Sequence, residues 1–98
     1  LGDAQVVDSD DPGVYALLRS TPEESVLVIV NLTKDPITRF TLALDKGQLS
    51  GAYAIAPLLG QGDYYAPTVN AAGGFDAYQP VAELAPQTAY ILQLQPVP

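Results

Sequence analysis

The sequence predicts an all-β fold, specifically an antiparallel, Greek-key-like β-sandwich of about seven to eight strands. Three observations favour this fold class. Short apolar runs are rich in β-branched and aromatic residues, Gly, Pro and Asp separate the runs, and no window repeats with the helical period of about 3.6 residues. The 98 residues are few for two domains, so 1–98 are predicted to form a single domain.

The longest apolar run, Ser25–Thr33 (SVLVIVNLT), is predicted to be the central strand. It contains no Gly or Pro, and β-branched residues dominate it, which favours a pleated strand over a helix. Alternate residues of a strand point to opposite faces, and here both faces are apolar. One face carries Leu27 and Ile29, and the other carries Val26, Val28, Val30 and Leu32. We therefore expect both faces to be covered, and the pattern leaves open which of them belongs to the core.

The residues before this run predict two further strands. Val6–Val7 is a short apolar pair that fits an edge strand, and the turn-rich segment 8–13 follows it. Val14–Ser20 is a second strand with two apolar faces. The short polar loop 21–24 then joins it to the central run, which predicts an antiparallel hairpin.

Downstream, Ile37–Leu44 alternates apolar and polar residues and is predicted to be a half-exposed strand. Ala52–Ala56 is predicted to be a strand that Pro57 stops. Segment 60–74 is rich in Gly and is predicted to be a long loop with a short pairing segment near Thr68–Val69.

The C-terminal part predicts one weak and one strong strand. Phe75–Leu84 is weakly strand-like and is interrupted by Pro80. Thr88–Leu94 is the strong one, with Tyr90, Leu92 and Leu94 expected on its inner face.

Composition and charge argue against several classes of function. The net charge of −7 and the four scattered basic residues disfavour binding to nucleic acid or to anionic membranes. No Cys is present for disulfides or metal ligation, and no apolar stretch approaches the roughly 20 residues that span a bilayer. The chain begins at Leu1 and contains no Met, so we expect it to be processed or cut from a longer protein.

Catalytic residues are not expected in this chain. Without His or Cys, the common nucleophile–base pairs cannot form. Lys34 and Lys46 could replace His as a base, but both lie in predicted surface turns, where nothing would lower the pKa of a lysine. The neighbouring carboxylates of Asp10–Asp11 and Glu23–Glu24 could in principle form a glycosidase-like pair. Solvated turn charges are the favoured interpretation, because a catalytic pair needs a cleft that so small a chain hardly has room for.

Asp8, Asp10 and Gly13 match the start of an EF-hand calcium loop. The fifth position of that loop is Pro12 and the twelfth is Arg19, where a bidentate Glu is required, so an EF-hand is excluded. An Asp-rich turn is favoured over a calcium site of another geometry. We therefore predict neither a metal ligand nor a cofactor-binding residue.

Two other motifs have a functional and a structural interpretation. Tyr64–Tyr65, in the Gly-rich segment, could stack on a sugar, but the favoured alternative is that one ring closes the end of the core while its hydroxyl reaches water. Asn31-Leu32-Thr33 matches the N-glycosylation pattern. Because it ends a predicted central strand, Asn31 is expected to bond the adjoining turn instead.

Three segments in order resemble the C-terminal β-sandwich domain of the α-amylase family of glycoside hydrolases. In that family an apolar strand with a Tyr–Arg pair is followed by a strand ending in Val-x-Asn-Leu-Ser/Thr, and a Leu-x-Pro segment precedes a Leu-rich last strand. The matching segments here are 14–19, 26–33 and 84–94, with Ala56–Gly60 at the family's Leu-Leu-Gly-like turn. Tyr15 and Arg19 are more widely spaced than the usual pair.

The resemblance implies a non-catalytic accessory domain that packs on and stabilises the catalytic (β/α)-barrel of an α-amylase-like parent enzyme acting on α-glucans. The barrel holds the family's catalytic carboxylates, so none is carried over to this chain. The expected partner is that barrel, with α-glucan as a further candidate. Two alternatives stay open: an autonomous starch-binding module that uses Tyr64 and Tyr65, and an immunoglobulin-like protein-interaction domain.

Overall fold

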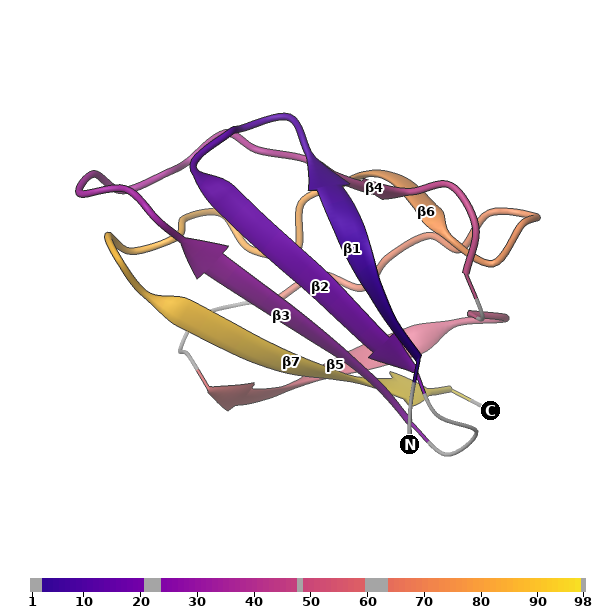
Figure 1. The fold of residues 1–98 in the computed structure, drawn as a ribbon. Coiled ribbons are helices and arrows are strands. Elements are labelled where there is room, and N and C mark those ends of the chain that lie inside the picture. The colour runs from indigo at the N-terminus through magenta and orange to yellow at the C-terminus, as the bar shows by residue number, and fades with distance from the viewer. Residues whose placement is uncertain (1–2, 21–23, 48, 60–63, 98) are drawn as a thin grey trace.

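Seven strands, all paired antiparallel, make up the regular structure of residues 3–20, 24–47, 49–59 and 64–97, the parts of the chain that this computed structural model describes (Figure 1). The strands are β1 (Asp3–Ser9), β2 (Val14–Ser20), β3 (Ser25–Asn31), β4 (Leu42–Leu44), β5 (Tyr53–Leu59), β6 (Phe75–Tyr78) and β7 (Ala89–Pro96). The described ranges contain no helix. The predicted all-β, antiparallel fold class is therefore confirmed.

The strands form one curled sheet in the order β5-β7-β3-β2-β1-β4-β6. β1 to β3 follow one another as neighbours, and the chain then returns through a long connection to place β4 beside β1. This 4-1-2-3 order is the Greek-key arrangement. Because β1 pairs with both β2 and β4, it joins the long strands to the short strands β4 and β6, which lie above them in Figure 1.

The central strand directs one of its two apolar faces into the core. Leu27 and Ile29 of β3 are fully buried, whereas the alternate residues Val26, Val28 and Val30 stay partly exposed. Register with both neighbours extends the buried rows, because Leu27 pairs with a leucine of β2 and a leucine of β7. The question that the sequence left open is thus resolved in favour of the Leu27 and Ile29 face.

The short strands close the core from the other side. On β6, Phe75 and Tyr78 are both buried although they are three positions apart, which simple alternation does not allow. A register shift against β4 and the positive φ of Ala77 (45°) show that the strand bulges between them. The two rings therefore meet edge to face at 5.2 Å between their centroids.

Two strand predictions were wrong because pairing depends on distant segments. Val6 and Val7 belong to β1, which is seven residues long and lies between β2 and β4, so it is not an edge strand. In the predicted strand Ile37–Leu44, only Leu42–Leu44 is a strand. The predicted alternation nevertheless holds, since Phe40, Leu42 and Leu44 are buried. Ile37 leaves the ladder because its backbone exchanges two hydrogen bonds with Leu84, at 3.0 and 2.8 Å.

Pro57 does not stop the strand predicted at Ala52–Ala56. β5 continues through Pro57 to Leu59, because β5 lies at the edge of the sheet, where a residue without an N–H is tolerated. The register shift between Pro57 and Leu59 marks the place where the ladder adjusts.

The predictions for the C-terminal part agree more closely with the structure. The pairing segment near Val69 is confirmed by its bridge to Phe75, although 60–63 of the predicted loop lie outside the described residues. The weak strand is regular only as β6, and Val81 and Leu84 beyond Pro80 form isolated bridges. β7 confirms the last strand and its inner face of Tyr90, Leu92 and Leu94.

Ile29→Ala is expected to destabilise the chain by about 2–5 kcal/mol, because it leaves a cavity in the core. Val28→Ala, one residue away on the opposite face, is expected to change the free energy of unfolding by less than about 1 kcal/mol. Urea unfolding of both variants measures the difference. Equal losses for the two variants would contradict the assignment of faces.

Candidate functional site

The side of the sheet that faces away from the core is apolar over four strands, and we call it the outer face. Val6 and Tyr15, at one margin, are 63% and 44% exposed. Further residues on β2, β3 and β7 are partly exposed on the same side. The apolar residues of the outer face are Val6, Tyr15, Leu17, Val26, Val28, Val30 and Ile91. Isolated surface hydrophobic residues need no explanation, but a contiguous group is typical of an interaction site.

Strand register makes this group continuous. Residues that lie directly opposite on neighbouring antiparallel strands share a face, with Cβ atoms about 4.5–5.5 Å apart. The pairs of β1 with β2, β2 with β3 and β3 with β7 therefore place four apolar side chains in one transverse row: Val6, Leu17, Val28 and Ile91. A second row consists of Tyr15, Val30 and Ala89.

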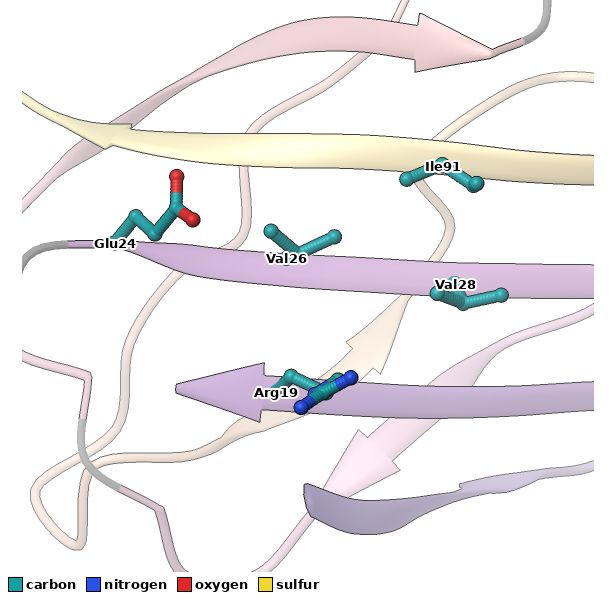
Figure 2. Close-up of a pocket in the computed structure, with 5 residues that line it drawn as sticks. All are labelled: Arg19, Glu24, Val26, Val28 and Ile91. Carbon is teal, nitrogen blue, oxygen red and sulfur yellow. The ribbon is translucent and has the colours of Figure 1, made fainter. Parts of the chain in front are cut away.

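A groove of about 340 Å³ crosses the outer face, lined by Arg19, Glu24, Val26, Val28 and Ile91. Figure 2 shows Val26 and Val28 on β3 between Arg19 on β2 and Ile91 on β7, with Glu24 just before β3 begins. Arg19 lies opposite Val26 in the register, which explains why its charge flanks the valines. The groove thus has an apolar floor and a polar end, where Glu24 lies on the β7 side of β3 and Arg19 lies on the β2 side.

Glu24 is held at this polar end by β7. The side-chain amide of Gln93 donates a 2.8 Å hydrogen bond to the Glu24 carboxylate. Gln93 itself lies opposite Val26, so the contact spans the groove end from β7 to β3. This bond fixes the direction of one carboxylate oxygen beside the apolar floor.

The two adjacent tyrosines are not exposed together. Tyr64 packs against the core, whereas Tyr65 is 58% exposed. The backbone of Tyr65 is fixed by its N–H bond to the Pro80 carbonyl (2.8 Å) and by the Tyr78 hydroxyl, which donates to its carbonyl. The prediction that one ring closes the core is confirmed for Tyr64.

The expected contact of that hydroxyl with water was wrong. The Tyr64 hydroxyl is buried and has no hydrogen-bond partner among the described residues. Burial, and secondly the neighbouring Tyr90, raise the pKa of Tyr64 above its usual value. Burial also raises the pKa of Tyr78. Neither shift places a titrating group near neutral pH, so acid–base chemistry gains no support from the tyrosines.

The acidic turn uses its carboxylates to bond the backbone. Asp10 Oδ1 accepts from the Thr41 N–H at 2.6 Å, and Asp11 Oδ1 accepts from the Gly13 N–H at 2.8 Å. Within the described part of the chain, no group of three His, Cys, Asp or Glu side chains could hold a metal ion. The Asp-rich turn is therefore the better interpretation of this segment, and Glu23, from the other acidic pair, lies outside the described residues.

Asn31 is a structural hub. Its side chain is fully buried at the end of β3, and its amide nitrogen lies within hydrogen-bond distance of the carbonyls of Asp35 (2.9 Å), Leu84 (3.1 Å) and Ala85 (3.1 Å). Its carbonyl accepts from the N–H of Thr33 at 2.8 Å. The predicted bond to the adjoining turn is confirmed. A side-chain nitrogen that is buried and bonded in this way is not accessible for glycosylation.

Comparison of the chain with protein-family models, with curated proteins and with solved structures finds no match. No helix in the described ranges is long and apolar enough to cross a bilayer. Sequence reasoning identified the Val26, Val28 and Val30 face but missed the groove. The polar end could have been found only from register, because pairing across three strands places Arg19 and Gln93 on either side of Val26.

Asn31→Asp is expected to destabilise the chain by about 3 kcal/mol or more, because a carboxylate cannot donate to the three carbonyls and each unsatisfied buried group costs about 1–3 kcal/mol. Leu32→Ala, at an exposed neighbouring position, should cost less than about 0.5 kcal/mol. Chemical denaturation of both variants measures the losses. A small loss for Asn31→Asp would show that water replaces these bonds and that Asn31 is no hub.

Proposed function

We propose that this chain is a non-catalytic accessory domain whose outer face docks against a larger neighbouring domain of the same parent protein and stabilises it. The observation that carries the proposal is the continuous apolar row across β1, β2, β3 and β7. A strand that is apolar on both faces is typical of a sheet covered on both sides. The core covers one side of β3, and the docked neighbour covers the other.

The size of the outer face fits a tethered domain better than a free partner. Strands about 4.8 Å apart and residues rising about 3.3 Å give four strands of some seven residues a footprint of roughly 19 by 23 Å, or about 440 Å². Interfaces between domains of one chain bury about 600–1,500 Å² counting both sides, whereas stable complexes of separate proteins bury about 800 Å² on each partner. Counted on both sides, the footprint amounts to about 880 Å², which lies within the first range, while the roughly 440 Å² on one side lies below the second.

Charge disfavours a second copy of this chain as the occupant. Each copy carries a net charge of −7, so association of two copies brings together like charges that repel one another. A different, less acidic surface avoids this repulsion. The neighbour therefore differs chemically from the domain itself.

Geometry also favours a tethered neighbour. Asp3 pairs with Ser20, Ser20 with Ser25, and Ser25 with Leu94, so the first and last strands reach the same end of the sheet (Figure 1). The polar end of the groove lies at that end, since Arg19 precedes Ser20. A domain joined to either terminus is thus held beside the groove at high effective concentration.

The resemblance to the α-amylase C-terminal domain supports the identity of the neighbour. The resemblance implies that the docked neighbour is the catalytic (β/α)-barrel of an α-amylase-like glycoside hydrolase acting on α-glucans. The catalytic carboxylates would then lie in that barrel. The Asn-Leu-Thr segment on which the resemblance partly rests coincides with the Asn31 hub, so a structural reason exists for that motif.

Val28→Asp tests the docking. In this chain alone the variant should lose no more than about 1 kcal/mol, because the position is partly exposed. In the parent protein it should lose about 2 kcal/mol or more, because the new carboxylate is buried without a partner. Thermal and urea unfolding measure both losses. Leu32→Asp, an equally acidic change at an exposed site just past the end of β3 and outside the groove lining, is the matched control and should have a small effect in both. Equal losses for Val28→Asp in the two proteins would overturn the docking.

Affinity electrophoresis in glycogen or starch gels tests the starch-binding alternative. We expect no retardation of the chain, because only Tyr65 of the tyrosine pair is exposed and a single ring offers no platform. Tyr65→Ala should migrate in the same way as the unmodified chain. Retardation that Tyr65→Ala abolishes would make the domain a carbohydrate-binding module.

A further inference from the structure

We propose that the free edge of β5 pairs with the same edge of a second copy of this chain, so that the two sheets join across a two-fold axis at Ala54. β5 stands at one end of the strand order, beside β7 (Figure 1). This pairing uses a different surface from the outer face and does not depend on docking there. Three features of the edge support it: its outward backbone groups, its lack of charge and its register.

The hydrogen bonds to β7 determine which backbone groups of β5 point away from the sheet. In an antiparallel pair every second residue bonds its partner, and the residues between direct their N–H and C=O to the opposite side. The Val97 N–H donates to the Ala52 carbonyl at 2.9 Å. By alternation Ala54 also bonds β7, whereas Tyr53 and Ile55 direct their backbone groups to the free edge. These outward groups have no hydrogen-bond partner among the described residues.

Only half of this edge is protected against pairing with another strand. Native proteins blunt edge strands with charges, Pro, bulges or short length. The opposite edge strand, β6, is four residues long, bulges at Ala77 and carries the exposed Asp76. On β5 the protection consists of Pro57 and the register shift that follows it. The first half, Tyr53–Ala56, has neither charge nor Pro.

The strands nearest this edge keep charge away from a second copy. β5, β7 and β3 contain no charged residue, so the first charge on a strand, counted from this edge, is Arg19 on β2. Three strand spacings of about 4.8 Å put β2 roughly 14 Å from β5, whereas the screening length is about 8 Å at physiological ionic strength. The repulsion due to the net charge of −7, which disfavours a second copy on the outer face, is therefore weaker at this edge.

The outward groups of β5 are complementary to those of a second copy. A two-fold axis through Ala54 makes two β5 strands antiparallel and puts Tyr53 of each copy opposite Ile55 of the other. Each outward N–H then meets an outward C=O across the axis. Tyr53 and Ile55 are only partly buried in one copy, on the side of the core. Pairing brings the ring of one against the branched side chain of the other, which is a stabilising cross-strand pair.

Pro57 and Gly51 select this register. With the axis at Ala54 these two residues lie opposite each other, just beyond the paired segment. An axis at Ile55 would put Tyr53 opposite Pro57, which has no N–H to donate. An axis at Tyr53 would put Ile55 opposite Gly51, whose φ of 77° is not that of an extended strand. The axis at Ala54 is therefore the one that pairs every outward group of the unprotected half.

Sedimentation velocity of this chain tests the pairing. An edge of a few residues buries less than a standard interface, so we expect weak association that appears between about 10 μM and about 1 mM at about 0.15 M salt. The mean mass should rise toward that of a dimer and no further, because a two-fold interface is closed. Over the same range, hydrogen exchange at the amides of Tyr53 and Ile55 should slow, whereas the amide of Ala54, which bonds β7, should be protected throughout.

Variants at the axis test the register. Ala54 is exposed, so Ala54→Lys leaves the core intact, but it places two like charges opposite each other and should weaken dimerisation by about tenfold or more. Ala54→Asp should do the same. A mixture of the two variants should dimerise again, because the axis puts position 54 of one copy opposite position 54 of the other.

Two control variants separate this edge from other surfaces. Ala82→Lys makes the same change of charge at an exposed site outside the strands and should leave dimerisation intact. Val28→Asp, which tests the outer face, should also leave it nearly unchanged. Urea unfolding confirms that each variant is folded. A chain that stays monomeric, a dimer that Ala54→Lys leaves intact, or a Lys and Asp mixture that stays monomeric would overturn the inference.

Discussion

The central strand β3 carries apolar side chains on both faces, and the rest of the structure accommodates that constraint. Leu27 and Ile29 share one core with β2 and β7, because register places Leu27 in a row of leucines and Ile29 in the next inward row, between an alanine and a tyrosine. A side-chain period of two then forces the valines to the opposite side. The core lies against the first face only, so the second face is left as an apolar surface that is partly exposed. The constraint thus determines both where the core lies and where a neighbour can dock.

At the end of β3, a buried side chain supplies hydrogen bonds to backbone groups that would otherwise be buried without partners. Asn31 has no ladder partner for its side chain, and it uses both ends of its amide to satisfy the backbone of two segments that are far apart in sequence. Its own N–H bonds the Thr88 carbonyl at 3.0 Å. A single polar residue therefore joins β3, the segment after it and the approach to β7. This arrangement explains why a polar residue is compatible with a fully buried position.

Local pattern was enough to predict strands that contain their own signal. β2 and β7 lie within a residue or two of their predicted bounds, because long apolar runs bounded by turn residues need no information from elsewhere. The predictions for Val6–Val7, Ile37–Leu44 and Pro57 were wrong because edge or interior position depends on pairing with distant segments. Ile37 illustrates this dependence, since its backbone partner Leu84 lies far along the chain. The groove was beyond prediction for the same reason, as its polar end is assembled from three strands.

The exposure of the outer-face methyl groups tests the central claim most directly. A neutral soluble nitroxide attenuates NMR signals of methyl groups that reach solvent. In this chain alone, the methyl groups of Val26, Val28 and Ile91 should be attenuated far more than those of the buried Leu27 and Ile29. In the parent protein, the outer-face methyl groups should become as protected as the core. Equal attenuation of the outer-face methyl groups in the chain and in the parent protein would contradict the account.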